Sequence, residues 1–147
     1  MEPEHPSLGA LVGDWTTEMT HRLLPDSVLR GRSTFELLEG GKFLLQREHL
    51  DHPEFPDSSH AVIGGAGADD LRMHYFDSRG VVRIFEMTID AGVWTFVRSK
   101  TDFSPLEFHQ RLTWTLSEDG QTMAALGEIS QDGVTWEEDI NVTYRRT

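Results

Sequence analysis

The side chains of this sequence that could take part in chemistry include two arginines that a predicted strand pairing brings together, Arg83 and Arg98. An arginine guanidinium offers a rigid fork of donors that fits a carboxylate. An arginine that points into a protein interior needs an anionic partner, because an unpaired buried charge is costly. The two residues therefore indicate either capture of a carboxylate-like group or internal pairing with Glu86, Glu138 or Asp77.

Other polar residues extend this set of candidates. Arg47 and His49 stand two residues apart and would share one face of a strand, where they could contact a polar group. Tyr75 and Glu138, if both lie in an apolar pocket, could act as an acid and a base, since burial raises the pKa of each. The sequence has no Gly-x-Ser-x-Gly, no phosphate-binding glycine loop and no His-Glu-x-x-His, so enzyme chemistry would depend on this pair.

The seven histidines do not predict a metal site. Zinc needs three or four ligands with groups behind them that hold them in place, and no such spacing is present. A single inward histidine is enough to ligate haem iron. His49, His21 and His109 are the candidates for that role, so haem stays open as an alternative and no cofactor is otherwise expected.

Composition excludes several classes of partner. The chain has 147 residues, a net charge of -12 and a pI near 4.8. Such acidity argues against nucleic acid and against an anionic membrane surface. No apolar run approaches the ~20 residues of a membrane span, and residues 1–6 do not resemble a signal peptide. Without cysteine there are no disulfides, thiol nucleophiles or cysteine-bound zinc. We expect one domain, 1–147, in the cytoplasm, as a monomer or homodimer.

The remaining pattern is that of β-strands from Gly13 onward, after a short helix or turn over 7–12. About ten runs of alternating apolar and polar residues are separated by turn signals such as Asp119-Gly120 and Asp132-Gly133. The runs are 15–23, 28–38, 42–50, 60–66, 71–77, 81–89, 93–100, 108–117, 122–130 and 134–145.

These runs predict an all-β fold, an antiparallel up-and-down barrel of about ten strands. A long meander tends to close, since closure removes its unpaired edges. Barrels somewhat larger than the smallest ones enclose a ligand cavity. The sequence therefore predicts a ligand-binding interior.

The turns assign side chains to the inner face. A two-residue turn at Asp90-Ala91 and a three-residue loop at 78–80 give one panel, comprising Leu71, Met73, Tyr75, Arg83, Phe85, Met87, Trp94, Phe96 and Arg98. Two-residue turns at the Asp-Gly pairs give a second, comprising Phe108, Gln110, Leu112, Trp114, Met123, Ala125, Gly127, Ile129, Trp136, Glu138, Ile140, Val142 and Tyr144. A three-residue loop around Gly40 gives a third, comprising Phe35, Leu37, Phe43, Leu45, Arg47 and His49. In this register Arg83 faces Arg98.

Gly13-Asp14-Trp15 opens the first predicted strand, and a Gly-x-Trp in that place resembles the calycin superfamily. Lipocalins, fatty-acid-binding proteins and nitrobindin-like haem-binding barrels belong to it, and strand number and length are most similar to the intracellular ten-stranded members. Segments 71–83, 132–139 and 143–145 resemble a group of uncharacterised bacterial barrel proteins. The resemblance implies a calycin-like, lipocalin-like barrel. It also implies that Trp15 plugs one end, covered by Arg145 or Arg146.

The sequence departs from the ligand-binding motifs of these families. The glycines of the longer Gly-x-Trp-x-Gly-x-Gly element are replaced by Thr17 and Met19. The last strand has no haem-binding histidine. Tyr144-Arg145-Arg146 stands where fatty-acid-binding proteins carry Arg-x-Tyr. No ligand is therefore carried over by residue matching.

The leading hypothesis is binding of a small, hydrophobic or amphipathic molecule inside the barrel. Its polar end would meet Arg83, Arg98 or Tyr75, with further contacts from Arg47, His49 and Gln110. Its apolar body would meet Trp94, Phe96, Trp114 and Trp136. The alternatives are an isomerase, cyclase or hydrolase that uses the same cavity, a haem or gas-ligand protein, and a structural domain filled by its own side chains.

Overall fold

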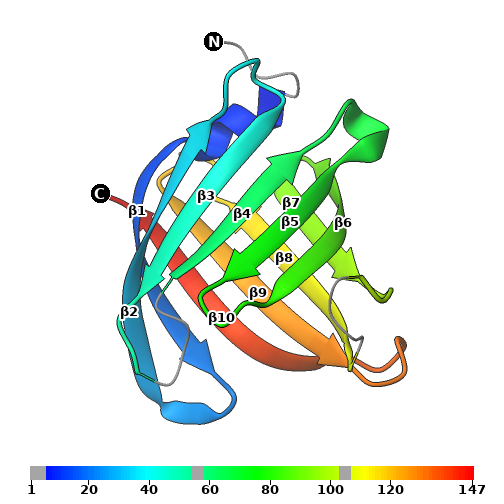
Figure 1. Ribbon diagram of the computed structural model, residues 1–147. Helices are drawn as coiled ribbons and strands as arrows, with labels where there is room; N and C mark the ends of the chain where they lie inside the picture. Colours follow the sequence, from blue (N-terminus) through cyan, green and yellow to red (C-terminus); the bar gives the residue numbers. More distant parts are fainter. Residues whose placement is uncertain (1–5, 54–57, 103–106) are drawn as a thin grey trace.

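The computed structural model describes residues 6–53, 58–102 and 107–147, which form a closed barrel of ten antiparallel strands (Figure 1). Each strand pairs with its neighbours in the chain, and β1 pairs with β10 to close the sheet. The elements are η1 (Pro6–Leu11), β1 (Gly13–His21), β2 (Leu24–Leu37), β3 (Phe43–Leu50), β4 (Ser58–Gly64), η2 (Ala68–Asp70), β5 (Arg72–Asp77), β6 (Val82–Asp90), β7 (Val93–Arg98), β8 (His109–Leu116), β9 (Thr122–Ser130) and β10 (Glu137–Arg146). The predicted all-β barrel is confirmed.

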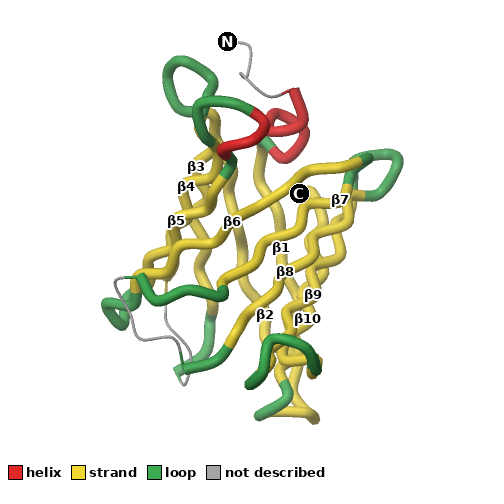
Figure 2. The backbone as a smooth tube through the Cα atoms, turned by 90° about the vertical axis from the view of Figure 1, so that its right-hand side faces the viewer, coloured by secondary structure: helices red, strands yellow, loops and turns green. Residues whose placement is uncertain are grey.

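The 3-10 turn η1 covers one end of the barrel. Figure 2 shows η1 and η2, the two helical turns, at the same end of the strands. Leu8 and Leu11 of η1 are fully buried. Trp15 is also fully buried, and its indole Nε1 donates to the Leu11 carbonyl at 3.0 Å. This end is therefore closed by apolar side chains.

Arg146 stabilises this closed end of the barrel. Its guanidinium lies 4.2 Å from the centre of the Trp15 ring and donates to the carbonyls of Gly120, Val12 and Ala10 at 2.6–2.7 Å. The expected arginine over Trp15 is thus Arg146 and not Arg145. The backbone conformation and the position of Arg146 also explain why the Gly-x-Trp motif begins with glycine. Gly13 has φ +134°, and a Cβ there would lie 2.7 Å from the Arg146 guanidinium.

Replacing Arg146 by methionine should lower the free energy of unfolding by about 1–3 kcal/mol, because the cation–π contact and the hydrogen bonds from a charged donor are lost. Urea unfolding measures this. Arg145→Met is the matched control, since Arg145 is exposed on the same strand, and its expected change is under about 0.5 kcal/mol. Equal effects of the two substitutions would contradict the role given to Arg146.

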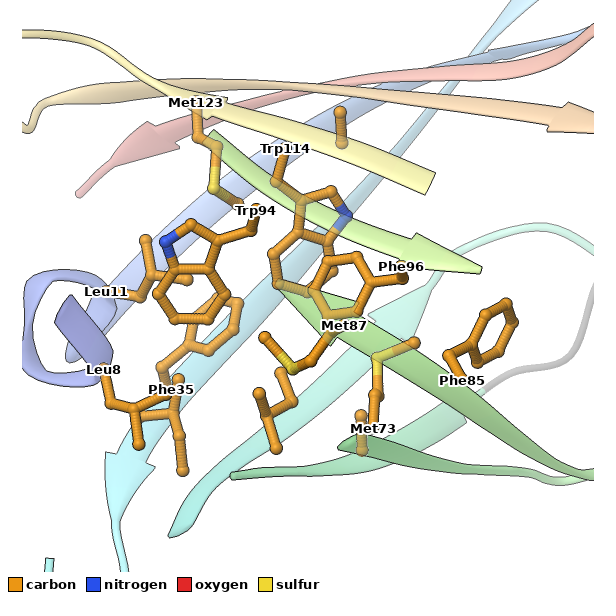
Figure 3. Packing of buried hydrophobic residues seen from close by; sticks show 14 of the residues in the cluster. Leu8, Leu11, Phe35, Met73, Phe85, Met87, Trp94, Phe96, Trp114 and Met123 are labelled. Carbon is orange, nitrogen blue, oxygen red and sulfur yellow. The ribbon is translucent and has the colours of Figure 1, made fainter. Parts of the chain in front are cut away.

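The half of the barrel next to η1 is filled by aromatic rings (Figure 3). The Phe96 and Trp114 ring centres are 4.6 Å apart, and Trp94 stacks on Trp114 at 6.0 Å. Phe35 meets Trp114 edge-on at 6.1 Å, and Tyr144 lies 6.3 Å from Trp114. Such offset and edge-to-face contacts favour a rigid cluster.

Three of the predicted strand registers concern the pairs β5–β6, β6–β7 and β8–β9. Tyr75 opposes Arg83 across β5–β6, as predicted. Trp114 opposes Ala125 across β8–β9, also as predicted. The predicted pairing of Arg83 with Arg98 is wrong, because the β6–β7 turn is Ala91-Gly92 and not Asp90-Ala91. The register moves by two residues, which keeps each side chain on its face and separates the two arginines along the strands.

The predicted inner face of residues 43–49 is wrong. Leu38 donates to the carbonyl of Phe43, so the β2–β3 loop has four residues, 39–42, and not three. Two successive glycines with positive φ, Gly40 at 95° and Gly41 at 71°, permit this longer loop. A change of one residue turns a strand over. The outward set is therefore Phe43, Leu45, Arg47 and His49, and the inward set is Leu44, Gln46 and Glu48.

The predicted inward positions of Trp136 and Glu138 are also wrong. β10 begins at Glu137, and a bulge between Glu138 and Ile140 shifts the register. The ring of Trp136 lies 4.3 Å from the guanidinium of Arg111, whose neighbours Gln110 and Leu112 take the inward positions. Glu138 is exposed and accepts a hydrogen bond from Asn141. The longer 131–136 connection puts both side chains outside the barrel.

Candidate functional site

The end of the barrel opposite η1 carries polar side chains on its inner face. They come from the ends of β3, β5, β6, β7 and β8, beyond the aromatic cluster. Of the residues expected at the site, those on inward positions are Tyr75, Arg83, Trp94, Phe96, Arg98, Gln110 and Trp114. Arg47, His49 and Trp136 are outside, and the exposed guanidinium of Arg47 pairs with Glu36.

Arg98 has an internal counter-ion. Its side chain is 2% exposed, and it donates through Nε and Nη2 to Asp102 at 2.9 and 3.0 Å. The same carboxylate accepts the backbone N–H of Ile84 at 2.9 Å. This bidentate geometry satisfies both buried charges. Arg98 therefore holds the Asp102 segment against β6, and its charge is already matched.

Arg83 is in a different position. Its Nε is buried and has no hydrogen-bond partner, and its guanidinium lies 5.8 Å from the Phe108 ring centre. Burial, followed by the positive charge of Arg98, lowers the pKa of Arg83. Arginine is effectively always protonated in proteins, so Arg83 keeps its positive charge. The barrel therefore holds a cation whose donor is unused.

Gln110 adds an unused acceptor to the same region. Its Oε1 is buried without a partner, and the residue opposes Arg98 across β7–β8. Buried polar atoms are normally hydrogen-bonded, and leaving one unpaired costs about 1–3 kcal/mol. A donor on Arg83 and an acceptor on Gln110 are the unmatched groups that face the interior.

Tyr75 is held by an ion pair. Its hydroxyl donates to Asp77 at 2.9 Å, and Arg79 donates to the same oxygen at 2.7 Å. Burial raises the pKa of Tyr75, and the bond to Asp77 raises it further. Burial also raises the pKa of Asp77, but hydrogen bonds from Arg79 and Tyr75 outweigh this and leave it below its ordinary value. Tyr75 is therefore a neutral phenol, and its hydroxyl hydrogen is already used in a hydrogen bond to Asp77.

A cluster that the sequence analysis missed lies around Glu48. Gln46 Nε2 donates to Glu48 Oε2 and to Ser33 Oγ, each at 3.1 Å. The Tyr144 hydroxyl, from the far side of β1 and β2, donates to Glu48 at 3.4 Å. Among the described residues no arginine, lysine or histidine contacts this carboxylate. The one-residue error at Gly40 hid the cluster, and the Gly-Gly doublet, which permits a longer loop, was the available signal.

Burial raises the pKa of Glu48 to about 7, and the hydrogen bond from Tyr144 offsets part of this effect. The carboxyl of an unfolded chain titrates near 4.5. The folded protein therefore binds a proton more tightly here than the unfolded chain does. Stability conferred by this proton is present below pH 4.5 and is lost as the pH rises to about 7.

Glu48→Gln should remove this loss, because the amide carries no charge. The free energy of unfolding of the variant minus that of the natural protein should rise between pH 4.5 and pH 7 by roughly 2–3 kcal/mol and then level off. Urea unfolding at a series of pH values measures the difference. A difference that is independent of pH would show that Glu48 titrates normally.

Of the three histidines expected as haem ligands, His21 continues the inward row of β1, opposite Ile140, and the other two point outward. His49 and His109 occupy outward positions. His21 accepts the N–H of Leu23 at Nδ1, and its Nε2 lies 3.6 Å from Asp139. Within the described ranges no group of three or more histidine, aspartate or glutamate side chains could hold a metal. Haem binding therefore stays a prediction.

A pocket of about 170 Å³ lies at the β9–β10 connection, and its lining is Ile129, Ser130, Gln131, Asp132, Thr135 and Glu137. It is smaller than the ~300 Å³ at which small-molecule sites begin. One oxygen of Asp132 already accepts the N–H groups of Val134 and Thr135 and bonds to Ser130. Asp132 Oδ1 in this pocket is therefore already paired, whereas Arg83 Nε and Gln110 Oε1 are not.

Comparison with known proteins bears on the fold. No family model matches the chain, and no curated protein sequence does. A solved structure, that of Rv2717c from M. tuberculosis, is similar with a TM-score of 0.64 over 99% of this chain and 98% of that one. The two sequences are 11% identical, so the likeness concerns the fold alone. In the part of the chain that the structure describes, no helix is long and apolar enough to cross a membrane.

Proposed function

We propose that this protein binds a small, mostly apolar molecule with an anionic end inside the barrel. The observation that carries this proposal is the buried Nε of Arg83, which has no hydrogen-bond partner. Arg83 would donate to the anionic group of the ligand. Gln110, whose Oε1 is equally unpaired, would accept a hydrogen bond from a hydroxyl or N–H group on the same end.

The balance of charge supports an anionic ligand. Arg98 and Asp102 neutralise each other, and Arg79 and Asp77 do the same. Arg83 has no such partner among the residues that the structure describes, and it lies near enough to Arg98 for their like charges to lower its pKa. A ligand carboxylate would provide the missing acceptor and offset this repulsion.

The neighbouring apolar side chains support a mostly apolar body. Phe108 lies beside Arg83. Leu112 and Trp114 follow Gln110 on the inward face of β8, and Phe96 follows Arg98 on that of β7. A polar contact at one end of an aromatic interior is the usual composition of a small-molecule site.

Binding is favoured over an enzyme function. Tyr75 and Glu138, the expected acid–base pair, do not meet. Glu138 is exposed on the outer face, and the Tyr75 hydroxyl is hydrogen-bonded to Asp77. Haem binding stays an alternative, for which His21 is the inward one of the three candidate histidines. A cytoplasmic location and a monomeric or homodimeric state stay predictions.

Native mass spectrometry of freshly purified protein, beside a denatured sample, tests for a retained ligand. A mass that leaves on denaturation and that belongs to an organic acid is the expected result. Titration calorimetry with octanoate then tests the site directly. Arg83→Met should weaken octanoate binding by about tenfold to a hundredfold, which is the effect of losing one hydrogen bond to a charged group.

Arg47→Met is the matched control for that titration. Arg47 was expected at the site from the sequence, but its exposed side chain pairs with Glu36 outside the barrel. This substitution should leave octanoate affinity unchanged. The proposed function is wrong if octanoate binds the natural protein and Arg83→Met equally, or if it binds neither.

A further inference from the structure

Glu48 is a carboxyl group inside the barrel that the proposed anion site does not use. Its hydrogen-bond partners, Gln46 and Tyr144, are neutral donors. Among the described residues, no arginine, lysine or histidine side chain contacts it. Tyr144 reaches it from β10, whereas Gln46 lies on the same strand as Glu48. The cluster is thus fixed from two sides of the barrel and leaves an interior carboxyl without a counter-ion.

The register relates Arg83 to Gln46, the residue that donates to Glu48 from two positions away on β3. Gln46 pairs with Ala61, Ala61 with Tyr75, and Tyr75 with Arg83, so the four residues form one row across β3, β4, β5 and β6. Strands lie 4.7–4.9 Å apart, which puts Gln46 and Arg83 roughly 14 Å from each other along the curved sheet.

Of the two strands between β3 and β6, β4 carries small inward side chains here. Ala61 separates Gln46 from Tyr75, and Ser59 separates Glu48 from Asp77 in the next row. Neither can fill the space that a leucine or phenylalanine would fill there. The first row therefore has Arg83 at one end and Gln46 at the other, with Tyr75 and the short side chain of Ala61 between them. Glu48 begins the next row, two residues along β3 from Gln46.

We propose that Glu48, with Gln46 and Tyr144, forms a second polar site inside the barrel that binds the ammonium group of a ligand. The ligand class is then an amphipathic amine, and with Arg83 occupied it is an amino acid whose amine and carboxylate stand at opposite ends of an apolar chain. The second statement rests on the proposed function, whereas the Glu48 site stands on its own geometry.

Proton exchange would accompany this binding. An ammonium ion favours the ionised form of the carboxyl, so Glu48 that is protonated in the free protein would release its proton to solvent. Tyr144 and Tyr75 are the titratable groups nearest to Glu48, and burial raises the pKa of both, so they stay neutral. Asp77, across Ser59, is held ionised by Arg79. Glu48 is therefore the group whose proton would leave.

Three probes with the same chain test the inference by calorimetry, namely octylamine, octanoate and terminal aminooctanoic acid. Glu48→Gln should weaken octylamine binding about tenfold to a hundredfold and leave octanoate unchanged. Arg83→Met should do the reverse. Aminooctanoic acid should bind more tightly than either single-ended probe and should lose affinity in both variants. Near pH 6, octylamine binding should release protons, measured from the dependence of the binding heat on the ionisation heat of the buffer.

The two proposals fail separately in this design. If octanoate binding depends on Arg83 but octylamine binds equally to the natural protein and to Glu48→Gln, or not at all, the amine site is wrong and the anion site stands. If octylamine depends on Glu48 while octanoate does not bind, the amine site stands and the anion site is wrong. Octylamine binding without proton release would also overturn the part given to Glu48, and this measurement needs no variant.

Discussion

Closure of the sheet between β1 and β10 is the constraint on which the rest of this structure depends. Once the sheet is closed, successive side chains on every strand point alternately into the interior and outward. The interior holds little water, so a polar group there must find a partner within the barrel or in a ligand. The closure is itself secured at the η1 end, where Trp15 is covered by Arg146 from the strand that completes the circle.

The interior obeys this requirement with few exceptions. Arg98 has Asp102, and Tyr75 and Arg79 share Asp77. Among the described residues, the Arg83 donor and the Gln110 acceptor have no hydrogen-bond partner, and the Glu48 carboxyl has hydrogen bonds but no counter-ion. All three lie beyond the aromatic cluster, away from the capped end. A barrel selected for stability alone would replace such groups with apolar side chains, because that exchange is often neutral or stabilising. Their presence in one region is the observation on which the proposed ligand site rests.

The sequence was sufficient to predict the parts of this fold that depend on alternation and turn chemistry. Ten alternating runs and their Asp-Gly turns predicted a closed meander, and the turn at Asp119-Gly120 placed Trp114 opposite Ala125 correctly. The β6–β7 register was wrong by two residues, which moved Arg98 along the strand but kept it inside. Errors of an even number of residues preserve the faces of a strand, so most of the aromatic wall was predicted correctly.

Errors of an odd number have a different consequence, and here they changed the chemistry assigned to the site. A three-residue loop at Gly40 would turn Arg47 and His49 inward, whereas the four-residue loop turns Gln46 and Glu48 inward. Each face of this strand carries both apolar and polar residues, so the hydrophobic pattern alone does not show which face points inward. The choice lies in the backbone of Gly40 and Gly41, whose positive φ angles accommodate the extra residue. Whether this part of the barrel offers basic or acidic groups to a ligand therefore depends on the length of one loop. This is why a shared fold at 11% identity carries no information about the ligand.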